Sequence, residues 1–195
     1  MTMPYAVSGK PTPAWSDQDL VSECLRGNEQ AWAALVEKYK GLVYSAPFRY
    51  RLSPQDAADI FQEVWFDLYS ELDNLRQFGA LRGWLITVAW HKCYQWKQRQ
   101  RRSERTTGEF DAEPIDGEAS FPEWKEQMER QQILRDAVAG LPPRCRTMVD
   151  MLFFRDPPLP YSEVARQLGL AEGSIGFIRG RCLQKLRTAL QEIGF

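Results

Sequence analysis

Residues 161–187 read YSEVARQLGLAEGSIGFIRGRCLQKLR and contain two helical patterns separated by a glycine. The first pattern, SEVARQL, is short, and Ser162 is expected to cap it. Gly169 is expected to end this helix in a left-handed conformation, and Leu170 then fills the corner before a longer helix over 172–191. A short helix, a glycine turn and a longer helix occur in the order that a helix-turn-helix requires.

The longer helix has two distinct faces at ~100° per residue. Its apolar stripe consists of Ile175, Ile178, Cys182, Leu186, Ala189 and Leu190. Its other half carries Gly173, Gly176, Phe177, Gly180, Arg181 and Gln184. Each glycine costs about 1 kcal/mol of helix stability relative to alanine in a helix interior. Three glycines flatten this face of the helix, which indicates that another molecule or another helix approaches it closely. We expect the major groove of DNA, contacted by Phe177, Arg181 and Gln184. The alternative is that Gly176 and Gly180 let another helix pack closely.

Charge is segregated along the chain although the net charge is only −1. Residues 82–105 carry Lys and Arg with a single Glu, and residues 109–129 carry Asp and Glu with a single Lys. The basic segment indicates nucleic-acid binding, and the acidic one, which has Gly, Pro and Ser but no helical period, indicates a tether between two domains. The alternative is a solvated helix followed by a solvated loop.

Outside the tether the apolar spacing is helical, so the sequence predicts an all-α protein of two small domains joined by a flexible acidic linker. Ser16 or Asp17, Asn28, and Ser53 followed by Pro54 are expected to cap the first three helices. The expected helices cover 17–27, 29–50, 54–72, 81–101, 123–139, 143–154, 162–168 and 172–191. The expected domains are a disordered tail over 1–15, a first domain over 16–102, the linker over 103–126 and a helix-turn-helix domain over 127–195.

Two helices of the first domain carry candidate binding faces. On the helix over 81–101, Trp90 and Tyr94 lie among basic residues and are expected to stack on unpaired bases. The alternative for Trp90 is packing in the core. On the helix over 54–72, Phe66 is expected at the centre of an exposed acidic face that binds protein.

Composition argues against several other classes of protein. No apolar run is long enough for a membrane span, and residues 1–15 lack the apolar core of a signal peptide, so a cytoplasmic location is expected. The cysteines Cys24, Cys93, Cys145 and Cys182 are therefore expected to be reduced. His91 and Cys93 point in different directions on a helix and the chain has no second His, so no metal site is expected. With one His, no clustered metal ligands and no Gly-rich phosphate loop after a strand, no other cofactor and no enzymatic activity are expected.

Four segments together resemble regions 2 and 4 of an extracytoplasmic-function (ECF) sigma factor, the small two-domain initiation subunit of bacterial RNA polymerase. They are DAADIFQEVWFDLYSEL at 56–72, DNLRQFG at 73–79, LRGWLITVAWHK at 81–92 and the stretch at 161–187. The resemblance implies a transcription initiation factor that binds core polymerase and promoter DNA, both as duplex and as melted single strand. An anti-sigma factor is a further candidate partner. The acidic linker would lie toward the RNA exit path.

The resemblance also assigns roles to residues. Contact with the clamp helices of the polymerase largest subunit is implied for Asp59, Gln62, Glu63 and Phe66. Melting and reading of the minus-ten promoter element are implied for Asn74, Arg76, Gln77, Phe78, Thr87, Trp90, His91, Tyr94, Lys97 and Arg101. Reading of the minus-thirty-five element is implied for Gly176, Phe177, Gly180, Arg181 and Gln184, with Ser174 near phosphate.

A stand-alone helix-turn-helix repressor or activator is the alternative function. It would account for the C-terminal half, but it leaves the acidic Phe66 face and the basic aromatic helix without a role.

Overall fold

The computed structural model describes residues 9–74, 80–107 and 120–195, and within these ranges the chain forms helices and no strand. The expected all-α class is confirmed. The chain divides into two compact units, Met1–Gln132 and Ile133–Phe195. The α-helices are α1 (Asp17–Leu25), α2 (Glu29–Arg49), α3 (Pro54–Glu71), α4 (Leu81–Thr107), α5 (Phe121–Ala139), α6 (Pro143–Val149), α7 (Tyr161–Leu168) and α8 (Ile175–Glu192).

The first three helices begin at the expected capping residues. The Ser16 side chain accepts a hydrogen bond from the backbone N–H of Asp19, Asn28 accepts from Gln30 and Ala31, and Ser53 accepts from Asp56. Each cap pairs a backbone donor that the first helical turn leaves without an intrahelical acceptor. These local sequence signals therefore place the starts of α1, α2 and α3 correctly.

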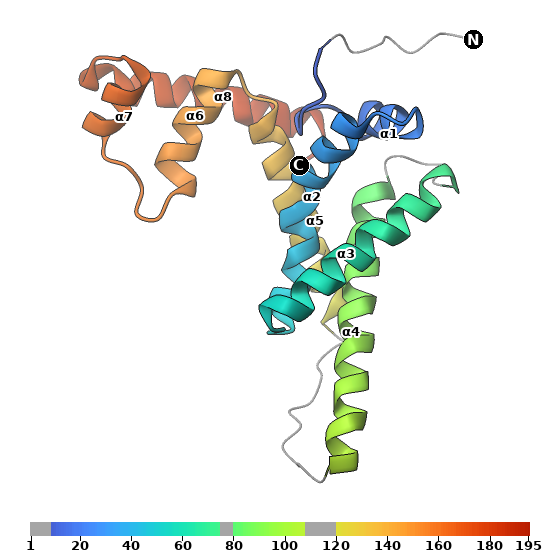
Figure 1. The fold of residues 1–195 in the computed structure, drawn as a ribbon. Coiled ribbons are helices and arrows are strands. Elements are labelled where there is room, and N and C mark those ends of the chain that lie inside the picture. Colours follow the sequence, from blue (N-terminus) through green and yellow to red (C-terminus); the bar gives the residue numbers. More distant parts are fainter. Residues whose placement is uncertain (1–8, 75–79, 108–119) are drawn as a thin grey trace. The chain divides into compact units, whose positions relative to one another are not determined.

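In the first unit, α2 packs against α1, α3 and α4, and α3 also crosses α4 (Figure 1). The fully buried Tyr39 of α2 donates its hydroxyl to the Asp17 carboxylate at 2.7 Å. Lys38 forms an ion pair with the other oxygen of the same carboxylate, also at 2.7 Å. One carboxylate at the start of α1 therefore ties α1 to α2.

The ends of α4 and α5 differ from the expected linker boundaries. α4 continues as helix to Thr107, and α5 already begins at Phe121. The first half of α5 contributes Trp124 and Met128 to the core of the first unit, whereas Leu134 and Val138 of its second half pack on the core of the second unit. The rest of the predicted linker, 108–119, lies outside the described residues.

The second unit has the helix-turn-helix order predicted from the sequence. α7 ends at Gly169, whose φ of 62° is left-handed, and a 3₁₀ turn at Glu172–Ser174 leads into α8. The expected Ser162 cap is wrong, because Pro160 stands in extended conformation directly before α7 and Ser162 lies exposed in the first turn. A π-helical segment, Asp150–Phe154, follows α6 where one continuous helix was expected.

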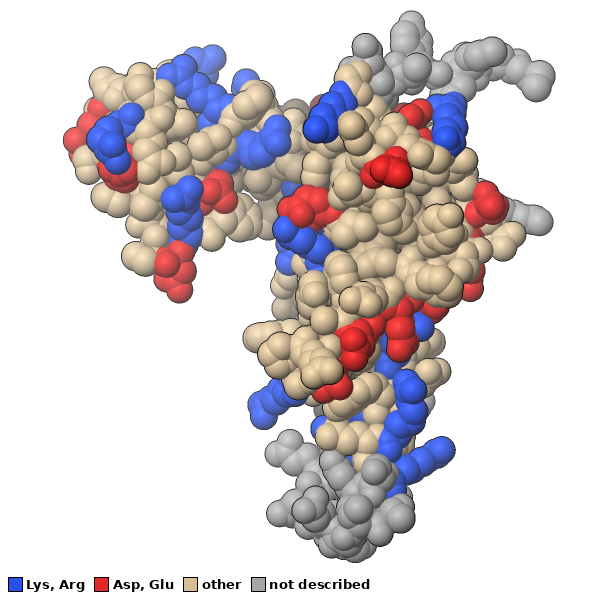
Figure 2. Space-filling view, viewed as in Figure 1, with Lys and Arg blue, Asp and Glu red and all other residues tan. Residues whose placement is uncertain are grey.

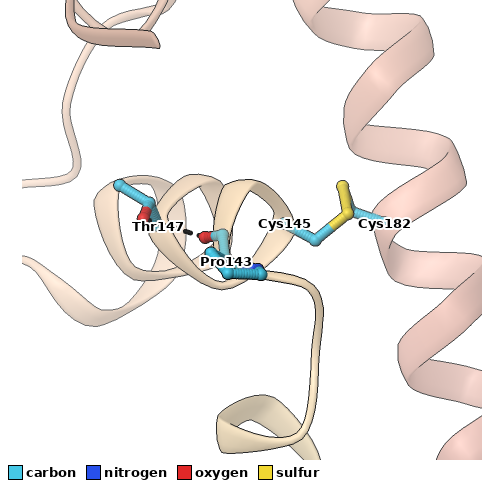
Figure 3. Close-up of a disulfide and its surroundings, with 4 residues drawn as sticks. All are labelled: Pro143, Cys145, Thr147 and Cys182. Carbon is cyan, nitrogen blue, oxygen red and sulfur yellow. Dashed lines mark hydrogen bonds between the residues drawn. A yellow bond between two sulfur atoms is a disulfide. The ribbon is translucent and has the colours of Figure 1, made fainter.

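Cys145 of α6 and Cys182 of α8 form a disulfide (Figure 3). The expectation that all four cysteines are reduced is therefore wrong for this pair. Both residues lie on the buried faces of their helices, and packing of these faces brings their Cα atoms to 5.2 Å, within the range that a disulfide spans. Cys24 and Cys93 are free, and burial raises the pKa of the Cys24 thiol to about 11 and that of Cys93 to about 12.

We expect reduction of the Cys145–Cys182 bond to lower the free energy of unfolding of the second unit by about 3–4 kcal/mol, because the bond closes a loop with a sequence separation of 37. Thermal unfolding of the full chain with and without a phosphine reductant measures this effect. Cys24→Ser is the control and should retain the dependence on reductant. If Cys145→Ser unfolds at the same temperature as the unreduced parent, the prediction is wrong.

Candidate functional site

The face of α8 opposite its core contacts is open to solvent. Ile175, Cys182 and Leu186 are buried against the second unit, as the apolar stripe predicts. Phe177 is 70% exposed. The other candidate reading residues that are exposed on this face are Gly176, Gly180, Arg181 and Gln184. The helix therefore presents one continuous surface on which small and polar residues surround a single aromatic ring.

The glycines of α8 face empty space. At Gly173, Gly176 and Gly180, a Cβ atom would meet no heavy atom within 4 Å. None of the three therefore accommodates another helix of the second unit, so the helix-packing alternative is wrong within this unit. The surface remains free for close approach by another molecule.

Two polar groups near the start of α8 are already oriented by contacts within the unit. The Arg181 guanidinium lies 5.7 Å from the centre of the Phe177 ring, close enough for a cation–π contact. Ser174 is half-buried, and its hydroxyl donates to the Ala171 carbonyl at 2.6 Å.

The sequence argument did not select Arg179, which is exposed on α8 and lies over the Tyr161 ring. In the sequence Arg179 follows Ile178 of the apolar stripe, and nothing in this position indicates a contact with Tyr161.

The acidic face of α3 is exposed where the sequence predicts it. Asp59, Gln62 and Glu63 are exposed, and Phe66 is 71% exposed among them. Figure 2 shows the acidic side chains along this helix. Tyr69, one turn after Phe66, is also 71% exposed and was missed, although its spacing of three residues places it beside Phe66. Exposed aromatic rings among carboxylates are typical of a surface that binds another protein.

Lys92 of α4 links this face to the neighbouring helix. Its Nζ lies 2.8 Å from the Asp67 carboxylate and 3.2 Å from that of Glu63. Burial alone would lower the pKa of Lys92, but the hydrogen bonds to Asp67 and Glu63 raise it above its ordinary value. Lys92 therefore remains charged, and Glu63 is held partly against α4.

The predicted nucleotide-binding face of α4 is only partly accessible. His91 is exposed, whereas Thr87, Tyr94, Lys97 and Arg101 are half-buried. Thr87 donates to the Gly83 carbonyl, and Gln98 donates to the Tyr94 hydroxyl. Asn74 is exposed before α4, and the other residues of this predicted site that precede α4, Arg76, Gln77 and Phe78, lie outside the described residues.

The expected exposure of Trp90 is wrong, because this side chain is only 3% exposed. Its ring centre lies 5.1 Å from that of Tyr50, 5.1 Å from that of Phe121 and 4.8 Å from that of Trp124. The last two residues belong to the start of α5, which covers this part of α4. The core-packing alternative for Trp90 is the one observed.

The described residues contain no group of three or more His, Cys, Asp or Glu side chains that could hold a metal ion. Among the same residues, no helix combines the length and apolar character needed to cross a membrane.

Comparison with known proteins identifies two family models in this chain. Residues 35–103 match the model of sigma-70 region 2, and residues 137–188 match that of sigma-70 region 4. The first range contains the α3 face and the candidate residues on α4, and the second contains α7 and the open face of α8. The two matches occur in the order of the two structural units.

Curated relatives resemble the chain over most of its length. It is 27% identical to the RNA polymerase sigma-H factor of Pseudomonas aeruginosa over 187 residues, covering 91% of this chain and 95% of that protein. It is 26% identical to the ECF RNA polymerase sigma-E factor of Escherichia coli over 174 residues, covering 85% and 88%. A chain of the solved RsbN–BldN complex is 23% identical, with a TM-score of 0.33 and coverage of 87% of this chain and 99% of that one.

We expect Gly180→Ala to raise the free energy of unfolding of the second unit by up to about 1 kcal/mol, because the residue lies inside α8 and the added Cβ meets no other atom. Hydrogen exchange of α8 amides in the full chain measures the change. Gly169→Ala is the matched control and should destabilise the unit, because its φ of 62° strains any residue with a Cβ. A loss of stability in Gly180→Ala would contradict the open placement of this residue.

Proposed function

The chain is a sigma factor of the extracytoplasmic-function type, which binds core RNA polymerase and directs it to promoters. We propose that the exposed faces of α3 and α8 and the partly accessible face of α4 divide this work. α8 reads the minus-thirty-five element, the acidic face of α3 binds polymerase, and α4 contacts the minus-ten element. The observation that carries the proposal is the open glycine face of α8, which lies in the region 4 match. The stand-alone repressor or activator is not favoured.

On α8, the glycines let the helix backbone lie close to the floor of the major groove. Arg181 can donate two hydrogen bonds to a guanine, Gln184 can pair with an adenine, and Phe177 can cover a thymine methyl group. The cation–π contact between Arg181 and Phe177 restricts both side chains before binding, which reduces the entropy lost when DNA binds. Ser174 lies near a phosphate of the DNA, to which its hydroxyl can donate when it leaves the Ala171 carbonyl.

On α3, Phe66 is the central apolar contact for the clamp helices of the polymerase largest subunit. Asp59, Gln62 and Glu63 surround it and pair with basic or polar groups of that partner. An exposed ring that enters a pocket of the partner contributes strongly to affinity, while the surrounding carboxylates favour a basic partner over other surfaces.

In the first unit, residues 74–79 and α4 together melt and read the minus-ten element. His91, Tyr94, Lys97 and Arg101 supply stacking surfaces and positive charge for unpaired bases and their phosphates. In this proposal the protein acts in the cytoplasm as an initiation factor and not as an enzyme. An anti-sigma factor is a further partner in this proposal.

We expect Phe66→Ala to preserve the fold and to weaken binding of core polymerase by about 2 kcal/mol, roughly thirtyfold in Kd, because the side chain is exposed and central to the face. Thermal melts and titration with labelled core polymerase measure the two effects. Phe48→Ala removes a ring of α2 that is 87% exposed and serves as the matched control. Equal affinity of the Phe66 variant and the parent would contradict the proposed contact.

Arg181→Ala is expected to weaken recognition of the minus-thirty-five element by about 1–3 kcal/mol through loss of a base or phosphate contact. Gly180→Leu should impair it by steric exclusion while the helix remains folded. Transcription by reconstituted holoenzyme, from promoters selected out of a genomic library, measures both effects. Arg187→Ala is the control, because Arg187 is also exposed but lies nearer the C-terminal end of α8. Unchanged promoter preference in both variants would contradict the proposed role of this face.

A further inference from the structure

The first half of α5 is docked on the core of the first unit. We call residues Ser120–Gln132 the strap. Trp124 is 4% exposed, Met128 6% and Gln132 1%. The Gln132 side-chain amide also donates to the backbone carbonyl of Lys38 in α2 at 3.2 Å. The strap is therefore held by buried side chains along its length and is not merely in contact at one end.

The strap covers one stripe of α4. Trp124 and Phe121 cover Trp90, and the Phe121 ring stacks on His91 with centres 6.4 Å apart. One turn before Thr87, a Cβ added at Gly83 would lie 3.5 Å from the carboxylate of Glu129. Positions 83, 87, 90 and 91 recur at helical spacing, so they share one face of α4. Two of the four residues, Trp90 and His91, are aromatic.

The strap occupies these groups with the same types of contact that a single-stranded nucleic acid would make. Tilted aromatic rings lie against Trp90, where an unpaired base would stack. The Arg49 guanidinium lies 5.8 Å from the centre of the Trp90 ring and donates to the Ser120 hydroxyl at 3.0 Å. Glu129 places a carboxylate beside Gly83, where it is paired with Lys125 of the strap itself at 3.9 Å. Strap and nucleotide cannot both contact Trp90.

We propose that the strap is an autoinhibitory element of the free protein: residues Ser120–Gln132 compete with single-stranded DNA for the Trp90 and His91 surface of α4. The inference rests on the proposed function, which assigns His91 and other residues of α4 to unpaired bases of the minus-ten element, and it adds Trp90 to them once the strap is released. In the docked state Trp90 is closed to bases and His91 is restricted on one side. Release of the strap opens a stacking surface of two aromatic rings with Arg49 beside it.

Trp124→Ala in the full-length chain tests the proposal, because it removes the ring that lies closest to Trp90. The probe is a fluorescein-labelled single-stranded DNA of mixed sequence, and anisotropy measures its affinity for the free protein. We expect affinity to rise at least about fivefold. Hydrogen exchange should speed up in residues 121–132 while the amides of α2 and α3 keep their protection. Gln127→Ala, on the exposed side of the same helix, is the matched control and should change neither measurement.

A second single variant and a double variant distinguish the possible results of this test. Phe121→Ser is milder, because Phe121 is only partly buried at the first residue of α5, and it should shift both measurements in the same direction if Trp124→Ala does not fold. His91→Ala combined with Trp124→Ala should reverse the gain in affinity. Faster exchange in the strap without a gain in affinity, while His91→Ala still weakens DNA binding, would overturn the autoinhibition alone. DNA affinity that responds to neither Trp124 nor His91 would overturn the minus-ten assignment of α4 and the autoinhibition with it.

Discussion

Each of the two units is small, so nearly every apolar stripe must be buried for the unit to fold. α8 satisfies this requirement with one stripe, in which Ile175 and Cys182 are at most 1% exposed, and the rest of the helix is left to solvent. In the first unit α2, α3 and α4 bury their stripes against one another. Large apolar side chains that stay exposed after this requirement is met, such as Phe66 and Phe177, are therefore informative about binding.

Features that depend on local sequence were predicted well. The caps at Ser16, Asn28 and Ser53 and the left-handed Gly169 follow from the hydrogen-bonding and steric needs of a few adjacent residues. The exposed faces of α3 and α8 follow from helical periodicity, because a residue opposite a buried stripe faces solvent unless something else covers it. The same reasoning located the open glycine face of α8.

The prediction errors arise where residues that are distant in the sequence cover or contact the surface of a helix. Trp90 was expected to be exposed because α4 alone gives no sign of Phe121 and Trp124, which lie about thirty residues further along the chain and cover it. The Cys145–Cys182 bond likewise depends on how α6 packs against α8, and spacing along the sequence carries no information about that packing. Ser162 was a reasonable cap by residue type, but Pro160 starts α7 earlier.

Lys92 of α4 contacts two carboxylates of the acidic α3 helix, those of Glu63 and Asp67. Glu63 is more exposed than Asp67, and Asp67 makes the shorter contact with Lys92. If Glu63 turns outward to a basic partner, Asp67 continues to neutralise Lys92, so no unpaired charge is left in a half-buried position. Glu63 can therefore pair with a basic group of a partner while Lys92 keeps its ion pair with Asp67 inside the first unit.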